Sequence, residues 1–380
     1  MTRTYIIQYN QEQTTMGKLK DYITTDRNGI IENRHQVHAA IVSSDGTLLY
    51  SVGDPSRVTL TRSAAKPAQA LAVISTGALE KFGFDEADLA LMCASHNSED
   101  RHLSRARDML RKVSAEEKDL RCGGHAALSE TVNREWIKKD YTPTAITNNC
   151  SGKHAGMLGG ARALGAEIGD YHLPCNPLQR KVRDVVEELA GLETGPEGVL
   201  WGVDGCNLPA PAFPLRNMAK IYAAFAEAAD VAEGARNASG KDRDMARIFS
   251  SMTRYPELVG GEGRFCTVLM RVFRGILIGK VGADGCYGIG IRASEYTRRL
   301  GVDGAMGIAV KIEDGNIGVL YSAVTEILDQ LDIGSPDMRW ELALFHHPKI
   351  VNTAGVVTGS TAHRFHVCGV RSMVGLCSED

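Results

Sequence analysis

One serine–lysine pair has the types and spacing of a nucleophile with its base. In TRSAAKP (61–67), Ser63 precedes Lys66 by three positions, and no other serine in the chain has a lysine at this spacing. Residues three apart on a helix share a face, so the hydroxyl and the amine can meet. A serine becomes a nucleophile when a neighbouring base takes its proton. The pair therefore indicates nucleophilic catalysis, and the first turn of an ordinary helix is the alternative explanation.

Two later segments strengthen the catalytic explanation. Ser95-His96-Asn97 has the pattern S-x-N, and Lys280 begins a K-x-G after the strand-like run GILI. Lys81 also begins a K-x-G, but it lies at the end of a predicted helix. The order S-x-x-K, S-x-N, K-x-G resembles the serine β-lactamases and penicillin-binding proteins. Each residue also has a structural explanation: Ser95 could be the N-cap of a helix, and Lys280 could be a surface lysine on a strand. Both explanations are less convincing when the three motifs are considered together.

Two further segments concentrate cysteine, lysine and aspartate. TNNCSGKHAGML (147–158) contains Cys150 and Lys153, and WGVDGCNLPAPAF (201–213) contains Asp204 and Cys206. The first segment lacks the upstream glycine of a phosphate-binding loop, so a nucleotide site is excluded. Without a C-x-x-C pair, these cysteines taken alone are most simply buried thiols.

Four segments in this order resemble the L-asparaginases of the Rhizobium etli type: RSAAKPAQA, ASHNSEDRH, NNCSGKHAGM and VDGCNLPAPAF. The resemblance runs from about residue 27 to 360. It departs at 95–99, which reads SHNSE where many relatives have SHSGE, so Asn97 has no assigned function. The resemblance implies a β-lactamase-like fold, a homodimer, and hydrolysis of L-asparagine to L-aspartate and ammonia.

The resemblance also implies the residues of the site. Ser63–Lys66 and Ser95–Lys280 would form two serine–lysine tandems. We expect Ser63 to attack and Lys66 to accept its proton; acylation of Ser95 is the alternative that the sequence leaves open. A zinc ion, one per chain, would be held by Cys150, Lys153 and Cys206. A lysine ligand must first lose its proton, which makes zinc binding strongly pH-dependent.

Three residues are predicted to contact the substrate. Asp204 would bind the α-amino group near the metal, and we assign Arg62 to the α-carboxylate. His125, in CGGHAA, is expected beside the site. A glutaminase, or a β-lactamase or peptidase acting on another amide, remains the alternative enzyme. A non-catalytic zinc-containing binding protein on the same fold is the alternative of another class.

The elements that must position these residues indicate an α+β fold. We expect one β-lactamase-like domain over residues 1–362, in which N- and C-terminal segments share an antiparallel sheet around a helical middle, and a loosely ordered tail over 363–380. The expected helices are 63–82, a segment after Ser95, 216–233, 242–252 and about 319–332. The expected strands are two runs in 35–54 around Ser-Asp-Gly, then 89–95, FCTVLMRVF, GILIGKVG, CYGIGI and GIAVKI.

Composition limits the kinds of partner and the cellular location that we expect for the chain. The chain of 380 residues has a formal net charge of −3 and no basic run, so we expect no nucleic-acid partner. No stretch has the apolar length of a membrane span, and the N-terminus lacks a signal sequence, so we expect no membrane association. The nine scattered cysteines predict reduced thiols and a cytoplasmic location.

Overall fold

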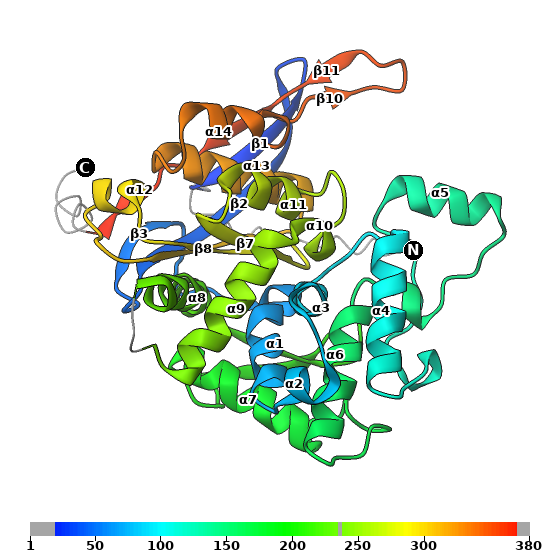
Figure 1. The fold of residues 1–380 in the computed structure, drawn as a ribbon. Coiled ribbons are helices and arrows are strands. Elements are labelled where there is room, and N and C mark those ends of the chain that lie inside the picture. Colours follow the sequence, from blue (N-terminus) through cyan, green and yellow to red (C-terminus); the bar gives the residue numbers. More distant parts are fainter. Residues whose placement is uncertain (1–19, 235–237, 371–380) are drawn as a thin grey trace, which may run out of the picture.

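The centre of the molecule is an eight-stranded antiparallel sheet built from both ends of the chain (Figure 1). The computed structural model describes residues 20–234 and 238–370. β3 (Leu48–Val52) pairs with β2, and β13 (Cys368–Gly369) pairs with β3. The remaining strands, in spatial order, are β12 (Thr361–Arg364), β1 (Tyr22–Arg27), β2 (Ile30–Ser43), β9 (Met306–Ile312), β8 (Cys286–Ile291) and β7 (Leu277–Gly282).

Two smaller sheets lie outside the central one. A three-stranded sheet contains β4 (Val58–Leu60), β6 (Pro209–Pro214) and β5 (Leu200–Val203). A two-stranded hairpin of β10 (Ile350–Val351) and β11 (Val357–Gly359) projects from the body of the molecule (Figure 1).

Helices fill the middle of the chain and cover the sheet, which confirms the α+β class and the shared sheet. Short 3-10 helices are η1 (Arg62–Ala65), η2 (Glu117–Asp119) and η3 (Ala145–Thr147). None of the helices within the described ranges is both long and apolar enough to cross a membrane. The α-helices are α1 (Lys66–Ile74), α2 (Ala78–Phe82), α3 (Glu86–Met92), α4 (Asp100–Lys112), α5 (Glu130–Lys138), α6 (Ser151–Ala163), α7 (Pro177–Ala190), α8 (Leu215–Gly234), α9 (Gly240–Arg254), α10 (Pro256–Val259), α11 (Phe265–Phe273), α12 (Glu295–Arg299), α13 (Ile317–Gln330), α14 (Pro336–Glu341) and α15 (Ala343–His346).

Two predicted strands are helices. The run at 89–95 forms the end of α3, which begins with a capping box at Asp85, and FCTVLMRVF forms α11. Both runs are buried almost throughout, so their apolar character alone does not distinguish a buried strand from a buried helix. The predicted helix 63–82 is divided at Gly77, whose φ of 75° is left-handed and ends the helical path.

The predicted tail begins inside the sheet. β12 continues to Arg364 and pairs with β1, and β13 joins Cys368 to Ser51 in β3. Edge strands carry unpaired backbone groups, and these late segments satisfy them. The boundary predicted at 362 is therefore wrong for residues 363–369, whereas 371–380 lie outside the described residues.

Helix α8 lies close against the sheet because glycines leave room for it. A Cβ atom at Gly288 would lie 2.0 Å from Cε2 of Tyr222, and one at Gly307 would lie 1.9 Å from a backbone oxygen of α8. The Tyr222 hydroxyl in turn donates a hydrogen bond of 2.7 Å to the Ala64 carbonyl oxygen. Strand β8 thereby fixes α8, and α8 fixes η1, which carries Ser63.

We expect Gly288→Ala to destabilise the protein and reduce any activity that depends on Ser63. The added methyl group collides with a buried ring that cannot turn aside, and overpacking of this kind usually costs about 1–3 kcal/mol. Thermal unfolding measures the loss. Gly169→Ala is the control, because that glycine has no heavy atom within 4 Å of an added Cβ. Equal melting temperatures for the two variants would contradict the packing described here.

Candidate active site

Ser63 lies in η1, immediately ahead of α1, with its side chain half-buried at the wall of a cavity. Arg62 before it has a φ of 45°, a left-handed conformation that turns the chain out of β4 into the helix. No hydrogen bond to the Ser63 hydroxyl is present within residues 20–234 and 238–370. The predicted contact between Ser63 and Lys66 is therefore not made, and the serine hydroxyl is free to meet a ligand.

Ser95 is the hydroxyl on which both predicted lysines converge. Lys280 Nζ donates to Ser95 Oγ at 2.8 Å, and Lys66 Nζ donates to the same oxygen at 3.1 Å. Lys66 also donates to the Ala94 carbonyl oxygen. Both lysines are fully buried, and Ser95 is 5% exposed. Ser95–Lys280 thus has the predicted contact, whereas Lys66 crosses from α1 to Ser95 and bridges the two predicted tandems.

Secondary structure explains how these three residues meet. Lys66 is the first residue of α1, and Lys280 is in β7, where every residue is buried. Ser95 follows α3 in a loop whose backbone N–H donates to the Val259 carbonyl oxygen at 2.9 Å. The loop is held again where His96 N donates to the Asn149 carbonyl oxygen at 3.1 Å. Three separate segments of the chain therefore position one hydroxyl and two amines.

Lys280 has an electrostatic environment suited to a base at neutral pH. Burial lowers the pKa of its amine, and the neighbouring Lys66 acts in the same direction, giving a value of about 7. The neutral form of Lys280, which can accept a proton, is therefore accessible near neutral pH. Such a shift toward the working pH is typical of functional lysines.

Ser63 and Ser95 line the same cavity of about 410 Å³. This volume suits a small-molecule ligand. The other lining residues are Leu128, Asn149, Arg264, Val281, Ala283, Asp284, Ile317 and Tyr321. The sequence analysis did not assign Arg264, Tyr321 or Asp284. Asn149 precedes Cys150 in the segment 147–158, which the sequence analysis identified as unusual. Of these newly found lining residues, Asn149 is therefore the one that the sequence could have indicated.

Arg264 brings a positive charge to the cavity wall. It precedes α11, and its Nη1 donates to Asn97 Oδ1 at 3.0 Å. Asn97 Nδ2 donates in turn to Glu99 Oε1 at 3.2 Å. The asparagine of the S-x-N segment thus acts on the cavity through Arg264, which it orients by a hydrogen bond.

The predicted metal ligands form one buried cluster. Cys150 precedes α6, Lys153 lies in its first turn, and Cys206 lies in the turn between β5 and β6. Lys153 Nζ is 3.1 Å from Cys206 Sγ, and the two cysteine thiols are hydrogen-bonded. Close packing of α6 on α3 requires Gly152, where a Cβ would lie 2.5 Å from Leu91 Cγ. This packing brings the cluster near the loop that carries the catalytic candidates.

Charges within the cluster compensate one another. The hydrogen bond from Cys150 lowers the pKa of Cys206 to about 5 against the effect of burial, and the positive charge of Lys153 adds to the lowering. Burial alone would lower the pKa of Lys153, but Cys206 and Cys150 outweigh it and raise the value. A thiolate and an ammonium group therefore form an ion pair at neutral pH.

Arg62 and Asp204 bind each other. Arg62 Nε donates to Asp204 Oδ1 at 2.9 Å, and its Nη1 donates to Asp284 Oδ2 at 3.4 Å. Burial alone would raise the pKa of Asp204, but Lys153 and Arg62 outweigh it and lower the value. The two predicted substrate-binding residues are thus close together, and a ligand that used both would have to separate them.

His125 lies one residue behind the cavity wall. Its Nε2 accepts a hydrogen bond of 3.1 Å from the backbone N–H of Asn149, and its Nδ1 is 2.7 Å from the Ala126 carbonyl oxygen. Asn149 itself lines the cavity. The structure therefore places His125 as a support for the wall.

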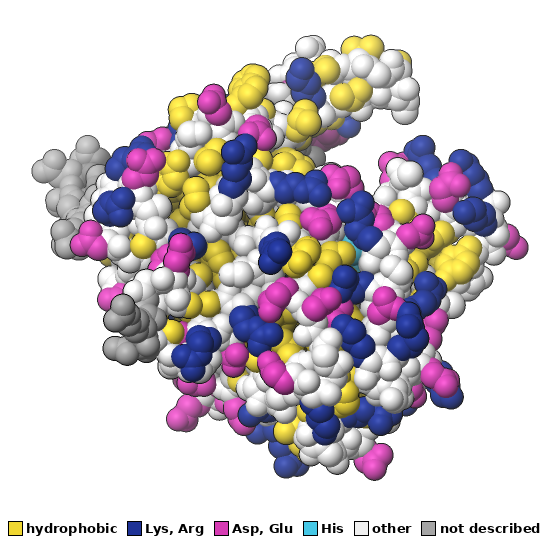
Figure 2. All heavy atoms as spheres, viewed as in Figure 1, with side chains coloured by type: hydrophobic (Ala, Val, Ile, Leu, Met, Phe, Trp, Pro, Cys, Tyr) yellow, Lys and Arg dark blue, Asp and Glu magenta, His cyan; other side chains and the backbone are white. Residues whose placement is uncertain are grey.

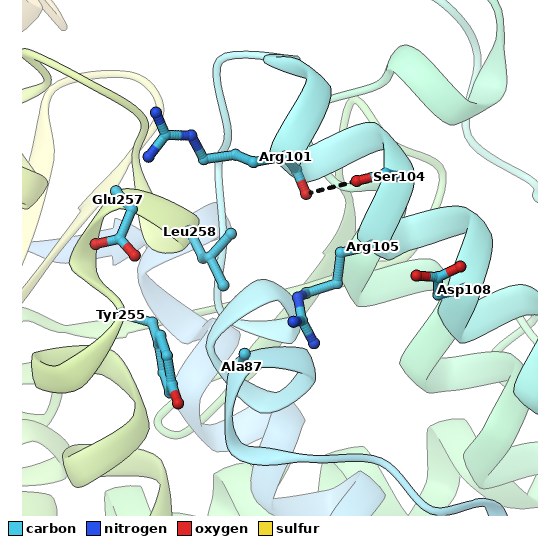
Figure 3. A pocket seen from close by; sticks show the side chains of 8 residues that line it. All are labelled: Ala87, Arg101, Ser104, Arg105, Asp108, Tyr255, Glu257 and Leu258. Carbon is cyan, nitrogen blue, oxygen red and sulfur yellow. Dashed lines mark hydrogen bonds between the residues drawn. The ribbon is translucent and has the colours of Figure 1, made fainter.

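A second hollow, of about 420 Å³, lies between α4 and α10 (Figure 3). Arg101, Arg105 and Asp108 face it from α4, and Tyr255 and Glu257 face it from the other side (Figure 3). It is an open surface depression that includes none of the predicted site residues. The cavity with the two serines is therefore the better candidate for chemistry.

Comparison with known proteins identifies the family. The family model described as L-asparaginase II matches residues 23–363. No curated protein matches the chain. The matched range contains both serines, the two lysines that contact Ser95 and the whole thiol cluster. The chain therefore belongs to the L-asparaginase II family.

Proposed function

We propose that the chain hydrolyses L-asparagine by a serine–lysine mechanism in the cavity shared by Ser63 and Ser95. Family membership makes the chain an asparaginase, a hydrolase that acts on L-asparagine. The convergence of two buried lysine amines on Ser95 Oγ carries the mechanistic part of the proposal. We also assign the chain to the Rhizobium etli type and its fold to the β-lactamase-like class. The antiparallel sheet, with a helical middle inserted between its strands, supports this assignment.

A neutral amine on Lys280 is the basis of the mechanism. Burial and the nearby charge of Lys66 lower the pKa of Lys280 to about 7, so its amine can accept a proton near neutral pH. The proton that Ser63 loses as its oxygen attacks the carboxamide carbon reaches this amine through Ser95, which lines the same cavity and is hydrogen-bonded to Lys280. Ser95, hydrogen-bonded to both amines, passes a proton to the departing nitrogen, and ammonia leaves. Water then attacks the ester carbon, L-aspartate leaves, and Ser63 recovers its proton.

Accessibility favours Ser63 as the residue that is acylated. Its side chain is half-buried at the cavity wall, whereas Ser95 is 5% exposed and already holds both amines. A nucleophile needs a clear approach to the substrate carbon, and a proton relay needs fixed partners. The surroundings of the two serines match these different requirements.

Charged side chains near the cavity suit the two α-groups of an amino acid. Arg62 and Asp204 would exchange their mutual ion pair for the α-carboxylate and the α-amino group. Arg264 offers a second partner for the carboxylate, because it lies in the cavity wall itself. Anchoring both α-groups fixes the distance to Ser63, which favours asparagine over glutamine with its additional methylene.

The donor set of Cys150, Lys153 and Cys206 fits a zinc ion. Zinc prefers thiolate and nitrogen ligands, all three side chains converge in a buried cluster, and Cys206 readily loses its proton. Three protein ligands leave a position for water or substrate. When bound, zinc would supply a positive charge that orients the substrate beside Asp204. Lys153 must surrender its proton to become a ligand, which lowers the affinity at acid pH.

Surface and cysteine chemistry support two further assignments. We propose a homodimer, because the projecting hairpin carries exposed Val351, Val356 and Val357, with exposed Ile30 and Ile31 at the start of the neighbouring strand β2. Figure 2 shows apolar side chains gathered on this projection.

We propose a cytoplasmic location, because the eight cysteines within the described ranges are free thiols.

Ser63→Ala should lower ammonia release from L-asparagine by at least ~10⁴-fold, because the nucleophile is lost. Ser95→Ala should lower it by about 10²–10⁴-fold, the usual contribution of a positioned proton transfer.

Release of ammonia from glutamine by the native chain should be about 10–200-fold less efficient than release from asparagine. Steady-state kcat/KM for both substrates measures these effects.

Ser75→Ala is the matched control, since Ser75 lies at the end of α1 and its hydroxyl donates only to Ala72. It should retain native activity. An electrophilic asparagine analogue, followed by peptide mass spectrometry, identifies the acylated serine. A label on the Ser95 peptide would reverse the roles of the two serines, and native activity in both folded alanine variants would refute the mechanism.

The pH profile should report Lys280. Its pKa of about 7 lies below the ordinary value, so the neutral amine is lost as pH falls through 7. We expect kcat/KM to fall about tenfold per pH unit below pH ~7 and to level off above it. Lys280→Arg should abolish activity across this range, because guanidinium stays charged. The exposed Lys81→Met variant should keep the native profile. A flat native profile from pH 5 to 8 would contradict this role.

Cys206→Ala should remove one zinc ion per chain relative to the native protein, because it deletes a thiolate ligand. Cys93→Ala, which changes another buried thiol, should retain the native zinc content. Elemental analysis after purification without chelators measures both. Zinc at this site should also be released as pH falls, because protons compete for all three ligands. Equal zinc in Cys206→Ala and native protein would exclude Cys206 as a ligand.

A further inference from the structure

A second group of metal-binding side chains lies near the C-terminal end of the chain. His346 ends α15, His347 follows it, and His363 belongs to β12. One ring nitrogen from each of the three lies within 4.8 Å of the others. Residues from a helix end and from an edge strand therefore bring three imidazoles together.

A half-buried carboxylate orients two of these rings. Glu326 Oε2, on α13, is 2.6 Å from His346 Nε2 and 3.0 Å from His363 Nδ1. Ser322, one turn earlier on the same helix, has its hydroxyl 2.8 Å from His363 Nε2 and donates to the His346 carbonyl oxygen at 2.7 Å. Metal-binding histidines commonly hydrogen-bond to a carboxylate that fixes the ring and increases its basicity. Glu326 supplies such support to His346 and His363, and a metal bound at His363 Nε2 would replace the contact with Ser322.

The third imidazole has no such support. The His347 ring is exposed and takes part in no hydrogen bond within residues 20–234 and 238–370. It stacks on His346 with ring centroids 3.9 Å apart and lies 5.5 Å from His363. Its nitrogens are therefore available, and the cluster has an open side.

We propose that His346, His347 and His363, with Glu326 as their carboxylate partner, bind a divalent transition-metal ion such as zinc. Imidazole nitrogen suits zinc, cobalt, nickel and copper, whereas magnesium and calcium prefer oxygen ligands. Zinc–nitrogen bonds of about 2.0–2.1 Å need the three nitrogens closer together than they lie here, and rotation of the exposed His347 ring can supply the adjustment.

The proposed ion would fasten the end of the sheet. β12 pairs with β1 at the sheet edge, and α15 is joined to it in sequence through the projecting hairpin. A metal bound to His363 and to the two histidines beside α15 would tie these segments to α13. None of the three histidines lines the cavity with the two serines, although α13 contributes Ile317 and Tyr321 to that cavity. The site is therefore separate from the proposed catalytic and thiol centres.

Cobalt is a suitable probe because its spectrum distinguishes the two metal sites. Cobalt held by cysteine gives a thiolate charge-transfer band in the near ultraviolet, and cobalt held by imidazole gives only visible ligand-field bands. We expect the metal-free native chain to bind one Co²⁺ of the imidazole type. His347→Gln should weaken that binding at least about tenfold, since even outer partners of metal-binding histidines contribute this much.

His366→Gln is the matched control, because His366 is exposed on the same segment but outside the cluster. It should titrate with Co²⁺ as the native chain does. In a Cys206→Ala background, Zn²⁺ should still raise the melting temperature, and adding His347→Gln or His363→Gln should remove the increase. Identical Co²⁺ titrations for native and His347→Gln chains, or no imidazole-type spectrum in the native chain, would overturn the proposal. Both readouts are independent of asparagine hydrolysis.

Discussion

The amines of Lys66 and Lys280 both donate hydrogen bonds to the hydroxyl of Ser95 in the protein interior. The surrounding structure holds these three groups in place. Water is excluded from Lys66 and Lys280, so a positive charge on both would be strongly unfavourable. Carbonyl oxygens of Ala94 and Val281 take up part of the hydrogen-bonding capacity of these amines. This environment lowers the pKa of Lys280 and keeps its amine ready to accept a proton. On the surface the same amine would remain charged at neutral pH.

The relative positions of Ser95, Lys66 and Lys280 depend on contacts far from these residues. Lys66 and Lys280 are separated by most of the helical middle, and α8 joins their segments. It packs closely on Gly288 of the sheet, and Tyr222 then ties the η1 backbone at Ala64. A small loosening between α8 and the sheet would therefore move Ser63 relative to the lysines. Misplacement by about 1 Å can reduce a rate a hundredfold.

The sequence predicted those elements and residues that a local motif identifies. It did not predict the type of elements that are buried on all sides, because their hydrophobicity shows no period. The strands after residue 277 were predictable because glycines and short apolar runs delimit them. The helices α3 and α11 were not, because a run buried on all sides has no polar face to reveal its period. Likewise, a spacing of three indicated Ser63 with Lys66, but only tertiary packing directs that lysine to Ser95. Arg264 had no sequence signal, since its position depends on Asn97.

The thiol cluster and the serine–lysine centre share one electrostatic field. The hydrogen bond from Cys150 lowers the pKa of Cys206, and Lys153 and the more distant Lys66 act in the same direction. Burial lowers the pKa of Lys280 against the opposing effect of Cys266, Lys66 lowers it further, and Cys150 opposes the lowering to a smaller extent. Any change of charge among the thiols therefore acts on the amine beside Ser95 without a contact between them. Adding positive charge to the cluster would hold Lys280 neutral to lower pH, whereas adding negative charge would do the reverse. Metal occupancy and the pH dependence of catalysis are thus expected to vary together in this chain.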